Sequence, residues 1–341
     1  MTGRLRWGIL GTAGIARKAF LPALAEAGGI AAAVASRDGD HAAGWAAEHG
    51  VERGVSGYQR LIDDPGVEAV YVALPNRLHA EWTIRALRAG KPVLCEKPLA
   101  GSLAETEQVL AAASQTGTLL WEAFVFPFHD QMARIRLLLA EGEIGELQEI
   151  QSGFHFMINE AVPNIRLSAE LAGGALNDVG CYPVALARHL FGTEPEAARA
   201  SAIWNPVGVD VATWGYLDFP GGRRLLLSCG FRRALDTFSR LLGTAGQIDI
   251  TNPFHPAAGD RFVVHLPGQD AVTRPGAGDD RYSFTAAIRH IQAAVAGQEE
   301  PRWLAVDTSL GSARALDDLI SSARARPAAS GGRRPGGQTL V

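Results

Sequence analysis

The first third of the chain alternates short apolar runs with stretches in which apolar residues recur at helical spacing. The run VEAVYVALP is apolar almost throughout and bounded by turn residues, which is typical of a strand buried on both faces of a sheet. Strands are expected at 4–10, 30–36, 67–75, 91–96 and 118–124, and helices at 14–28, 41–50, 79–90 and 102–116. Because strand and helix alternate at this spacing, the pattern predicts a doubly wound parallel sheet.

The pattern changes after residue 124, where candidate strands follow one another with few helices between them. The PGG at 220–222 has the composition of a hairpin turn. Strands are expected at 147–156, 211–219, 223–231 and 261–267, and helices at 129–142, 175–192, 282–297 and 307–325. These elements predict a second α/β region with a largely antiparallel sheet.

The length of 341 residues exceeds what one ordinary hydrophobic core organises, so two domains are expected. The change of pattern divides the chain into a first domain at 1–124 and a second at 125–325. The remaining segment, 326–341, is rich in Gly, Pro and Ser and is expected to be disordered.

Composition excludes several classes of protein. The formal net charge of −4 gives no general attraction to nucleic acid or to acidic lipid. No apolar stretch approaches the roughly 20 residues that cross a bilayer, and the N-terminal residues lack the pattern of a signal peptide. The three cysteines, Cys95, Cys181 and Cys229, are far apart with no CxxC pair, which argues against a disulfide framework or a metal site. A cytoplasmic protein is therefore expected.

The first expected strand runs directly into the stretch GTAGIA, which opens the first helix. Such a tight turn presents backbone N–H groups to a pyrophosphate and is typical of a dinucleotide site. Gly11 can form the turn, Ala16 can pack closely against the strand, and Thr12 and Ile15 belong to the same cofactor-binding segment. Ala13 departs from the usual pattern, because a second glycine normally stands there to keep the phosphates uncrowded.

The end of the second expected strand, VASRD, indicates which cofactor is preferred. An NAD site places an acidic residue there for the ribose hydroxyls, whereas an NADP site offers Ser and Arg to the 2′-phosphate. Ser36 and Arg37 come first and Asp38 only afterwards, so NADP(H) is preferred. NAD(H) stays possible, because a shift of one residue brings Asp38 to the ribose.

Three longer stretches, at 7–16, 70–100 and 173–184, together resemble the Gfo/Idh/MocA family of oxidoreductases, and the likeness extends to about residue 325. The chain looks most like the branch that contains dihydrodiol dehydrogenase, NADP-dependent xylose dehydrogenases and sugar ketoreductases. The resemblance implies an N-terminal Rossmann domain. It also implies a C-terminal α/β domain whose open sheet forms the substrate pocket and often a dimer interface, so a homodimer or higher homo-oligomer is expected.

The resemblance implies that the family's Glu-Lys-Pro motif is Glu96-Lys97-Pro98 and that Lys97 lies near the reacting carbonyl. The residues agree with this, because proline holds the preceding Lys97 extended at the carboxyl end of a parallel strand, where ligands bind. Partial desolvation there is expected to lower the pKa of the ammonium, so that it can exchange protons. The alternative is a surface lysine that pairs with Glu96.

Asp178 and Tyr182 are four residues apart in NDVGCYPV, so on a helix they share one face. In the branch named above, the tyrosine at this position is proposed as proton donor or acceptor, and hydride transfer at a C–OH carbon needs such a group. Lys97 as its electrostatic partner is expected to lower the pKa of the phenol. Two alternatives stay open, namely Lys97 as the proton carrier and a tyrosine that only packs in the core.

Further candidates come from the resemblance. Leu74, Pro75, Asn76 and His79 end the strand at 67–75 and begin the next helix, and the resemblance places them, with Glu96, along the cofactor. Without it, His79 is as readily a structural residue. Arg166 matches an arginine near the nicotinamide or substrate, although a free surface arginine is equally compatible with its loop.

The function expected from these residues is an NADP(H)-dependent oxidoreductase acting on a sugar or related diol, with an aldose such as xylose or glucose as the leading substrate class. One rival is a nucleotide-sugar ketoreductase. Such an enzyme binds the diphosphate of its substrate, and Arg232 and Arg233 could supply the positive charge for it. A rival of another class is a catalytically silent NADP-binding regulator. The presence of both Lys97 and Tyr182 argues against that rival.

Overall fold

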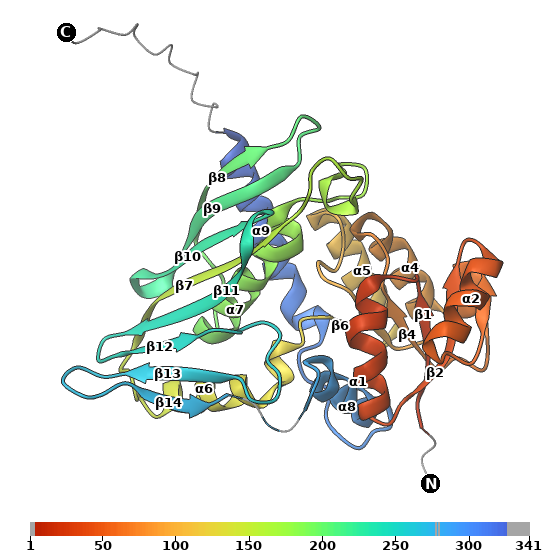
Figure 1. The fold of residues 1–341 in the computed structure, drawn as a ribbon, viewed down its shortest axis with the longest axis horizontal. Coiled ribbons are helices and arrows are strands. Elements are labelled where there is room, and N and C mark those ends of the chain that lie inside the picture. The colour runs from red at the N-terminus through yellow and green to blue at the C-terminus, as the bar shows by residue number, and fades with distance from the viewer. Residues whose placement is uncertain (1–3, 277, 279, 326–341) are drawn as a thin grey trace, which may run out of the picture.

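The computed structural model of the chain describes residues 4–276, 278 and 280–325. It contains two sheets, which lie on opposite sides of the molecule in Figure 1 with helices between them. The segment 326–341, expected to be disordered, lies outside the described residues. No helix in the described part of the chain has both the length and the apolar character needed to cross a bilayer.

The first sheet has six strands in the order β3-β2-β1-β4-β5-β6, and every neighbouring pair is parallel. Its strands are β1 Arg6–Leu10, β2 Ile30–Ser36, β3 Gly54–Ser56, β4 Ala69–Val72, β5 Val93–Cys95 and β6 Leu120–Glu122. This is the Rossmann strand order, and it confirms the expected doubly wound sheet. β3 was not predicted, because its three residues are too short and too exposed for a hydrophobic pattern.

Helices cover this sheet (Figure 1). They are the π-helical turn Ala16–Phe20 with α1 Leu21–Glu26, then α2 Gly39–His49, α3 Tyr58–Ile62, α4 Asn76–Arg88 and α5 Leu103–Thr116. The second helix begins two residues earlier than expected, because Asp38 caps it. Asp38 Oδ1 accepts hydrogen bonds from the backbone N–H groups of Asp40 and His41, at 2.9 and 3.1 Å.

The second sheet has eight strands in the order β14-β13-β12-β11-β7-β10-β9-β8. They are β7 Leu147–Met157, β8 Ala197–Trp204, β9 Asp210–Phe219, β10 Arg223–Gly230, β11 Arg232–Gly243, β12 Gln247–Ile250, β13 Arg261–His265 and β14 Val272–Pro275. Only β7 and β10 pair in parallel, so the prediction of a largely antiparallel sheet is confirmed. Four strands, β8, β11, β12 and β14, were not predicted.

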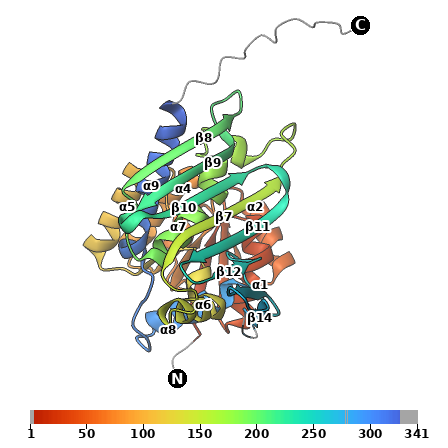
Figure 2. The same cartoon turned by 90° about the vertical axis from the view of Figure 1, so that its left-hand side faces the viewer.

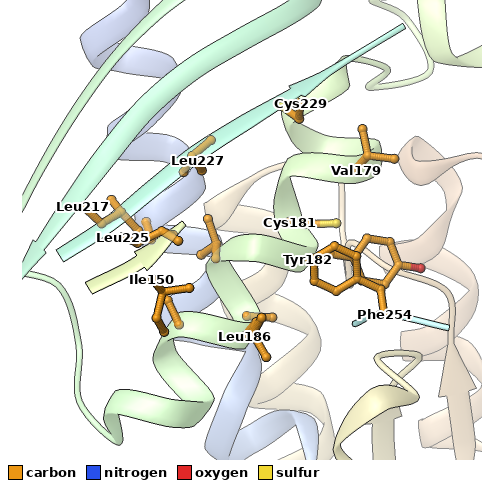
Figure 3. Close-up of a cluster of buried hydrophobic side chains, with 14 of the residues drawn as sticks. Ile150, Val179, Cys181, Tyr182, Leu186, Leu217, Leu225, Leu227, Cys229 and Phe254 are labelled. Atoms are coloured by element: carbon orange, nitrogen blue, oxygen red, sulfur yellow. The ribbon is translucent and has the colours of Figure 1, made fainter. Parts of the chain in front are cut away.

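One face of the second sheet packs on helices α6 Asp130–Ala140, α7 Cys181–Phe191 and α9 Ala305–Ala325, while Figure 2 looks onto its other face. Figure 3 shows the resulting core, in which side chains of β7, β9 and β10 meet α7 and the turn before it. Ile150, Leu217 and Leu225 contribute from the sheet, and Leu186 from α7. This packing fixes the first turn of α7, and with it Tyr182, against the sheet.

The chain returns to the first sheet before it ends. Helix α8, Phe284–Val295, buries its apolar face in the core of the Rossmann domain, together with Trp7 and Phe20. Thr285 Oγ1 donates a hydrogen bond to Glu26 Oε2 at 2.6 Å. The division of the chain into domains at 1–124 and 125–325 stays a prediction, and α8 packs across that division.

Candidate active site

A cavity of about 900 Å³ lies where the carboxyl ends of the parallel strands face the second sheet. All the residues predicted to act in catalysis or cofactor binding line it except Ala16, which is fully buried beneath the first turn. The two halves of the chain therefore supply one common cavity. This is the place where ligands bind in open α/β sheets.

The glycine turn after β1 forms one end of the cavity. Gly11 has φ +97°, and a Cβ atom there would lie 2.5 Å from the carbonyl oxygen of Ala73, so no other residue fits without displacing the backbone. Gly11 N–H donates to Ala35 O at 2.9 Å, which ties the turn to β2. Thr12, Ala13 and Ile15 follow on the cavity wall.

The end of β2 presents Ser36 and Arg37 to the cavity. Asp38 also borders it, but its Oδ1 caps α2. Two further cationic or titratable groups line the same region and were missed from the sequence, Lys18 and His41. His41 Nε2 lies 3.0 Å from Thr12 Oγ1, which links the glycine turn to the start of α2. No sequence pattern pointed to these residues, because helical geometry alone brings them to the cavity.

The loop from β4 to α4 forms the next part of the wall and is fixed by its own polar side chains. The two ring nitrogens of the fully buried His79 lie 2.7 Å from Leu74 O and 2.8 Å from Pro98 O. Asn76 Nδ2 donates to Ala172 O at 2.9 Å. Together with Pro75, which precedes α4, these residues connect the cofactor side of the cavity to the loop that bears Lys97.

Glu96 and Lys97 follow β5 and point to different partners. Glu96 Oε1 accepts a hydrogen bond from the hydroxyl of the buried Tyr71 at 2.6 Å. Lys97 Nζ donates to Asp178 O at 2.5 Å and to Asp178 Oδ1 at 3.2 Å. The alternative of a surface Lys97 paired with Glu96 is thus not what the structure has. The direct partner of the lysine is Asp178.

The expected lowering of the Lys97 pKa is wrong. Burial does lower this pKa, but the Asp178 carboxylate and the other acidic groups around it outweigh burial, and the net pKa lies above its ordinary value. Lys97 therefore stays an ammonium across the physiological pH range.

Asp178 joins the lysine to an arginine. It lies in the π-helical turn Leu176–Gly180 that precedes α7, and Arg166 Nε donates to its Oδ2 at 2.6 Å. Burial raises the pKa of Asp178, but the positive charges of Lys97 and Arg166 lower it by more than burial raises it. The net pKa of Asp178 is therefore below its ordinary value. Arg166 is accordingly bound to this carboxylate at the cavity wall and is not a free surface residue.

Tyr182 lies in the first turn of α7 and is only 4% exposed. The ammonium of Lys97 is 5.0 Å from the centre of its ring. The expected lowering of its pKa is wrong as well, because burial raises the pKa of the phenol by more than Lys97 lowers it. In Figure 3 the ring packs beside Phe254 and the hydroxyl oxygen points away from the hydrophobic cluster.

The hydroxyl of Tyr182 meets a residue that the sequence did not indicate, since its Oη lies 3.0 Å from His255 Nε2. His255 belongs to the loop between β12 and β13, where Asn252 Nδ2 donates to its carbonyl oxygen at 2.7 Å. Burial and then the positive charge of Lys97 lower the pKa of His255 to about 4. His255 lies in the stretch NPFHP, whose residues indicate a turn but not that this loop reaches α7.

Comparison with known proteins agrees with this geometry. Residues 5–124 match the family model described as "Oxidoreductase family, NAD-binding Rossmann fold", and residues 132–249 match the "GFO/IDH/MocA C-terminal domain".

Three relatives represent the branch expected from the sequence. The NADP⁺-dependent D-xylose 1-dehydrogenase 2 of Haloferax volcanii is 33% identical over 94% of this chain and 97% of its own. The trans-1,2-dihydrobenzene-1,2-diol dehydrogenase of Xenopus laevis is 34% identical over 72% of this chain and 74% of its own. The crystal structure of the 3-ketoreductase KijD10 of Actinomadura kijaniata, in complex with NADP and TDP-benzene, is 34% identical and has a TM-score of 0.86, covering 94% of this chain and 98% of that one. The resemblance is confirmed, and the chain belongs to the Gfo/Idh/MocA family of oxidoreductases.

Proposed function

We propose that this oxidoreductase uses NADP(H) to transfer hydride between the nicotinamide and a CH–OH or C=O carbon of a sugar or related diol. The observation that supports this most strongly is the convergence of Lys97, Asp178 and Tyr182 on the cavity that also receives the glycine turn. A hydride acceptor or donor and a proton-handling group are the two requirements of this reaction. The nicotinamide supplies the first when it is bound, and the protein supplies the second.

The residues fit such a cofactor. At Gly11 the backbone has no room for a Cβ atom, which keeps the turn tight and open toward a pyrophosphate. Ser36 and Arg37 line the cavity at the end of β2, where a 2′-phosphate is bound in NADP sites. The relatives from Haloferax and Actinomadura are described with NADP, which supports the same preference here.

The polar groups of the site have different roles at the reacting oxygen of the substrate. Lys97 is held as an ammonium by Asp178 and stabilises negative charge that develops on the substrate oxygen. Tyr182 lines the cavity and its hydroxyl points away from the hydrophobic cluster, so it exchanges a proton with that oxygen. Arg166 and Asp178 position the lysine, because their ion pair fixes the carboxylate that Lys97 contacts.

A free aldose, oxidised to its lactone, is the substrate class that we favour. The Haloferax relative is named as a D-xylose dehydrogenase. The rival substrate is a nucleotide-linked keto sugar, since the Actinomadura relative binds TDP-benzene. The two arginines expected to bind its diphosphate are engaged elsewhere. Arg232 pairs with Glu160 and Arg233 with Asp236, and neither lines the cavity.

A catalytically silent regulator fits the cavity less well. Cofactor binding alone does not need a largely buried Lys97 held by Asp178, nor a buried tyrosine on the wall of the same cavity. Burying these polar groups costs free energy that folding must offset, so their presence points to chemistry.

The deciding experiment follows nicotinamide absorbance with the purified protein, NADP or NAD, and a panel of free aldoses, inositols and diols. The variants Tyr182→Phe and Lys97→Met are measured beside the wild type, and Arg88→Ala, an exposed residue outside the cavity, is the control. We expect turnover of a free sugar with NADP and a loss of roughly 100-fold or more in each of the two variants. Turnover that survives both substitutions would contradict the assignment. A melting temperature that rises with TDP but not with sugars would favour the nucleotide-sugar reductase.

We further propose that the enzyme is a cytoplasmic homodimer. Cys95, Cys181 and Cys229 are all buried and unpaired with one another, as suits a reducing compartment. The outer face of the second sheet carries large exposed apolar side chains, Trp214 and Leu226, which suit an interface.

A further inference from the structure

His255 lines the cavity beside Tyr182, and the proposed function gives it no role. Its Nε2 lies 3.0 Å from Tyr182 Oη, and the two rings meet edge to face with centroids 5.1 Å apart. The loop that bears it is anchored on both sides. Asn252 Nδ2 donates to His255 O and to Asp260 Oδ2, and Asp260 Oδ2 also accepts from Ala257 N–H.

Oxidation of an alcohol releases a proton that the catalytic pair cannot keep. Lys97 donates to Asp178 and remains an ammonium, and Tyr182 already bears its own hydroxyl proton because burial raises its pKa. For Tyr182 to take the substrate proton, its own proton must leave in the same event. The only acceptor that the described residues place against its hydroxyl is the imidazole of His255.

We propose that His255 is the terminal proton acceptor of a relay in which Tyr182 passes the substrate proton to the imidazole. This inference rests on the proposed function. In the oxidation direction the substrate O–H bond breaks and a new Tyr182 O–H bond forms. The original Tyr182 O–H bond breaks and a His255 Nε2–H bond forms, while the C–H electron pair leaves as hydride to the oxidised nicotinamide. In the reduction direction every transfer is reversed, and the imidazolium is the acid.

The surroundings of His255 suit an acceptor. The groups that face it are Tyr182 from α7, Lys97 after β5 and Asp178 from the π-helical turn, with Asp260 on its own loop. Burial and the Lys97 charge favour the neutral ring, so its Nε2 is available at neutral pH. The opposing carboxylate of Asp178 stabilises the imidazolium once the proton has arrived.

The test separates proton transfer from mere packing against Tyr182. His255→Gln keeps a polar side chain but cannot become a cation. His265→Gln, at a half-buried residue of β13 outside the cavity, is the matched control. We expect kcat for oxidation to fall roughly 100-fold in the first variant and to be unchanged in the second. The wild type should show an acidic limb well below pH 6.5 in its kcat profile, and the His255→Gln profile should lack it. Added imidazole should restore part of the activity of His255→Ala.

A second readout does not depend on turnover. Nitrogen NMR of the folded wild type at pH 7 should show His255 Nε2 without a proton and accepting a hydrogen bond, and Tyr182→Phe should change its titration. A protonated Nε2 at that pH, or a His255→Gln variant within threefold of wild type with the same acidic limb, overturns the relay alone. If the wild type turns over no sugar or diol, the proposed function fails and the relay with it.

Discussion

Arg37 and Asp38 follow each other at the end of β2, yet their side chains are differently engaged. Asp38 Oδ1 already accepts hydrogen bonds from two backbone N–H groups of α2. If the Asp38 side chain turned toward a ribose, that helix would lose its N-terminal cap. Arg37 lines the cavity and brings a permanent positive charge. NADP(H) is therefore preferred because Asp38 caps α2, which leaves Arg37 as the charged residue available to the cofactor at this position.

The first prediction follows from that contrast. Arg37→Ala should weaken NADPH binding by roughly 10- to 100-fold, because a charge-assisted hydrogen bond contributes about 1.5–3 kcal/mol. NADH affinity should stay the same. Fluorescence titration with each cofactor measures both constants, and Arg88→Ala serves as control. Equal losses for the two cofactors, or none, would remove Arg37 from the 2′-phosphate site.

How far the sequence predicts the site can be judged from single residues. Lys97, Asp178 and Tyr182 were predicted because the resemblance to the family marks the Glu-Lys-Pro motif and the tyrosine, and the structure brings the three together. The direction of both pKa shifts was predicted wrongly, since these depend on burial and on the Asp178 carboxylate 3.2 Å from the ammonium. His255 was missed, because its contact with Tyr182 spans 73 positions and leaves no local pattern.

At the scale of elements, the turn from β1 into the first helix gives the second prediction. Gly11→Ala places a Cβ atom 2.5 Å from Ala73 O at a φ of +97°, whereas at Gly14 an added Cβ would meet nothing within 4 Å. Gly11→Ala should lower the free energy of unfolding by about 1–3 kcal/mol or more and weaken cofactor binding. Gly14→Ala should leave the free energy of unfolding nearly unchanged. Urea unfolding with and without NADPH tests both, and equal behaviour of the two variants would refute the steric argument.

Elements were predictable where hydrophobic pattern and burial coincide. The fully buried β4 was found because its whole sequence is apolar. β3 and β14 were missed because both are short, β3 being half-buried and β14 largely exposed, so neither carries a clear hydrophobic pattern. Helix α8 was predicted as a helix, but nothing local indicates that its apolar face packs beside Trp7 in the first domain.

At the scale of the whole molecule, the return of the chain in α8 brings a residue from the second half of the sequence to the cavity beside the first sheet. Phe284 of α8 is buried in the Rossmann core and also lines the cavity, where its ring is 6.3 Å from that of Tyr71. Tyr71 in turn holds Glu96 beside Lys97. A change in the packing of α8 against the first sheet therefore reaches the residue next to Lys97 through two contacts. We expect cofactor binding to raise the free energy of unfolding of the entire chain.

The outer face of the second sheet gives the last prediction. Trp214 of β9 and Leu226 of β10 are 46% and 36% exposed, and the register places Tyr216 opposite Leu226 on the same face. The alternate residues Leu225 and Leu227 point to the helices on the inner face. Trp214, Tyr216 and Leu226 form a small apolar patch among charged residues of this face, and a second copy of this chain is the partner that we propose for it.

Trp214→Glu should therefore convert a homodimer to a monomer, because dimerisation would bury an unpaired carboxylate at the centre of the interface. Light scattering after gel filtration measures the mass, and we expect the dissociation constant to rise roughly 100-fold or more. Val207→Glu introduces the same charge at a residue that is 62% exposed in the loop before β9, and it should leave the dimer intact. A wild-type monomer, or a dimer that withstands Trp214→Glu, would show that this face has another purpose. Since the cavity is lined from within one chain, a monomeric Trp214→Glu variant should still bind NADPH, which separates assembly from the active site.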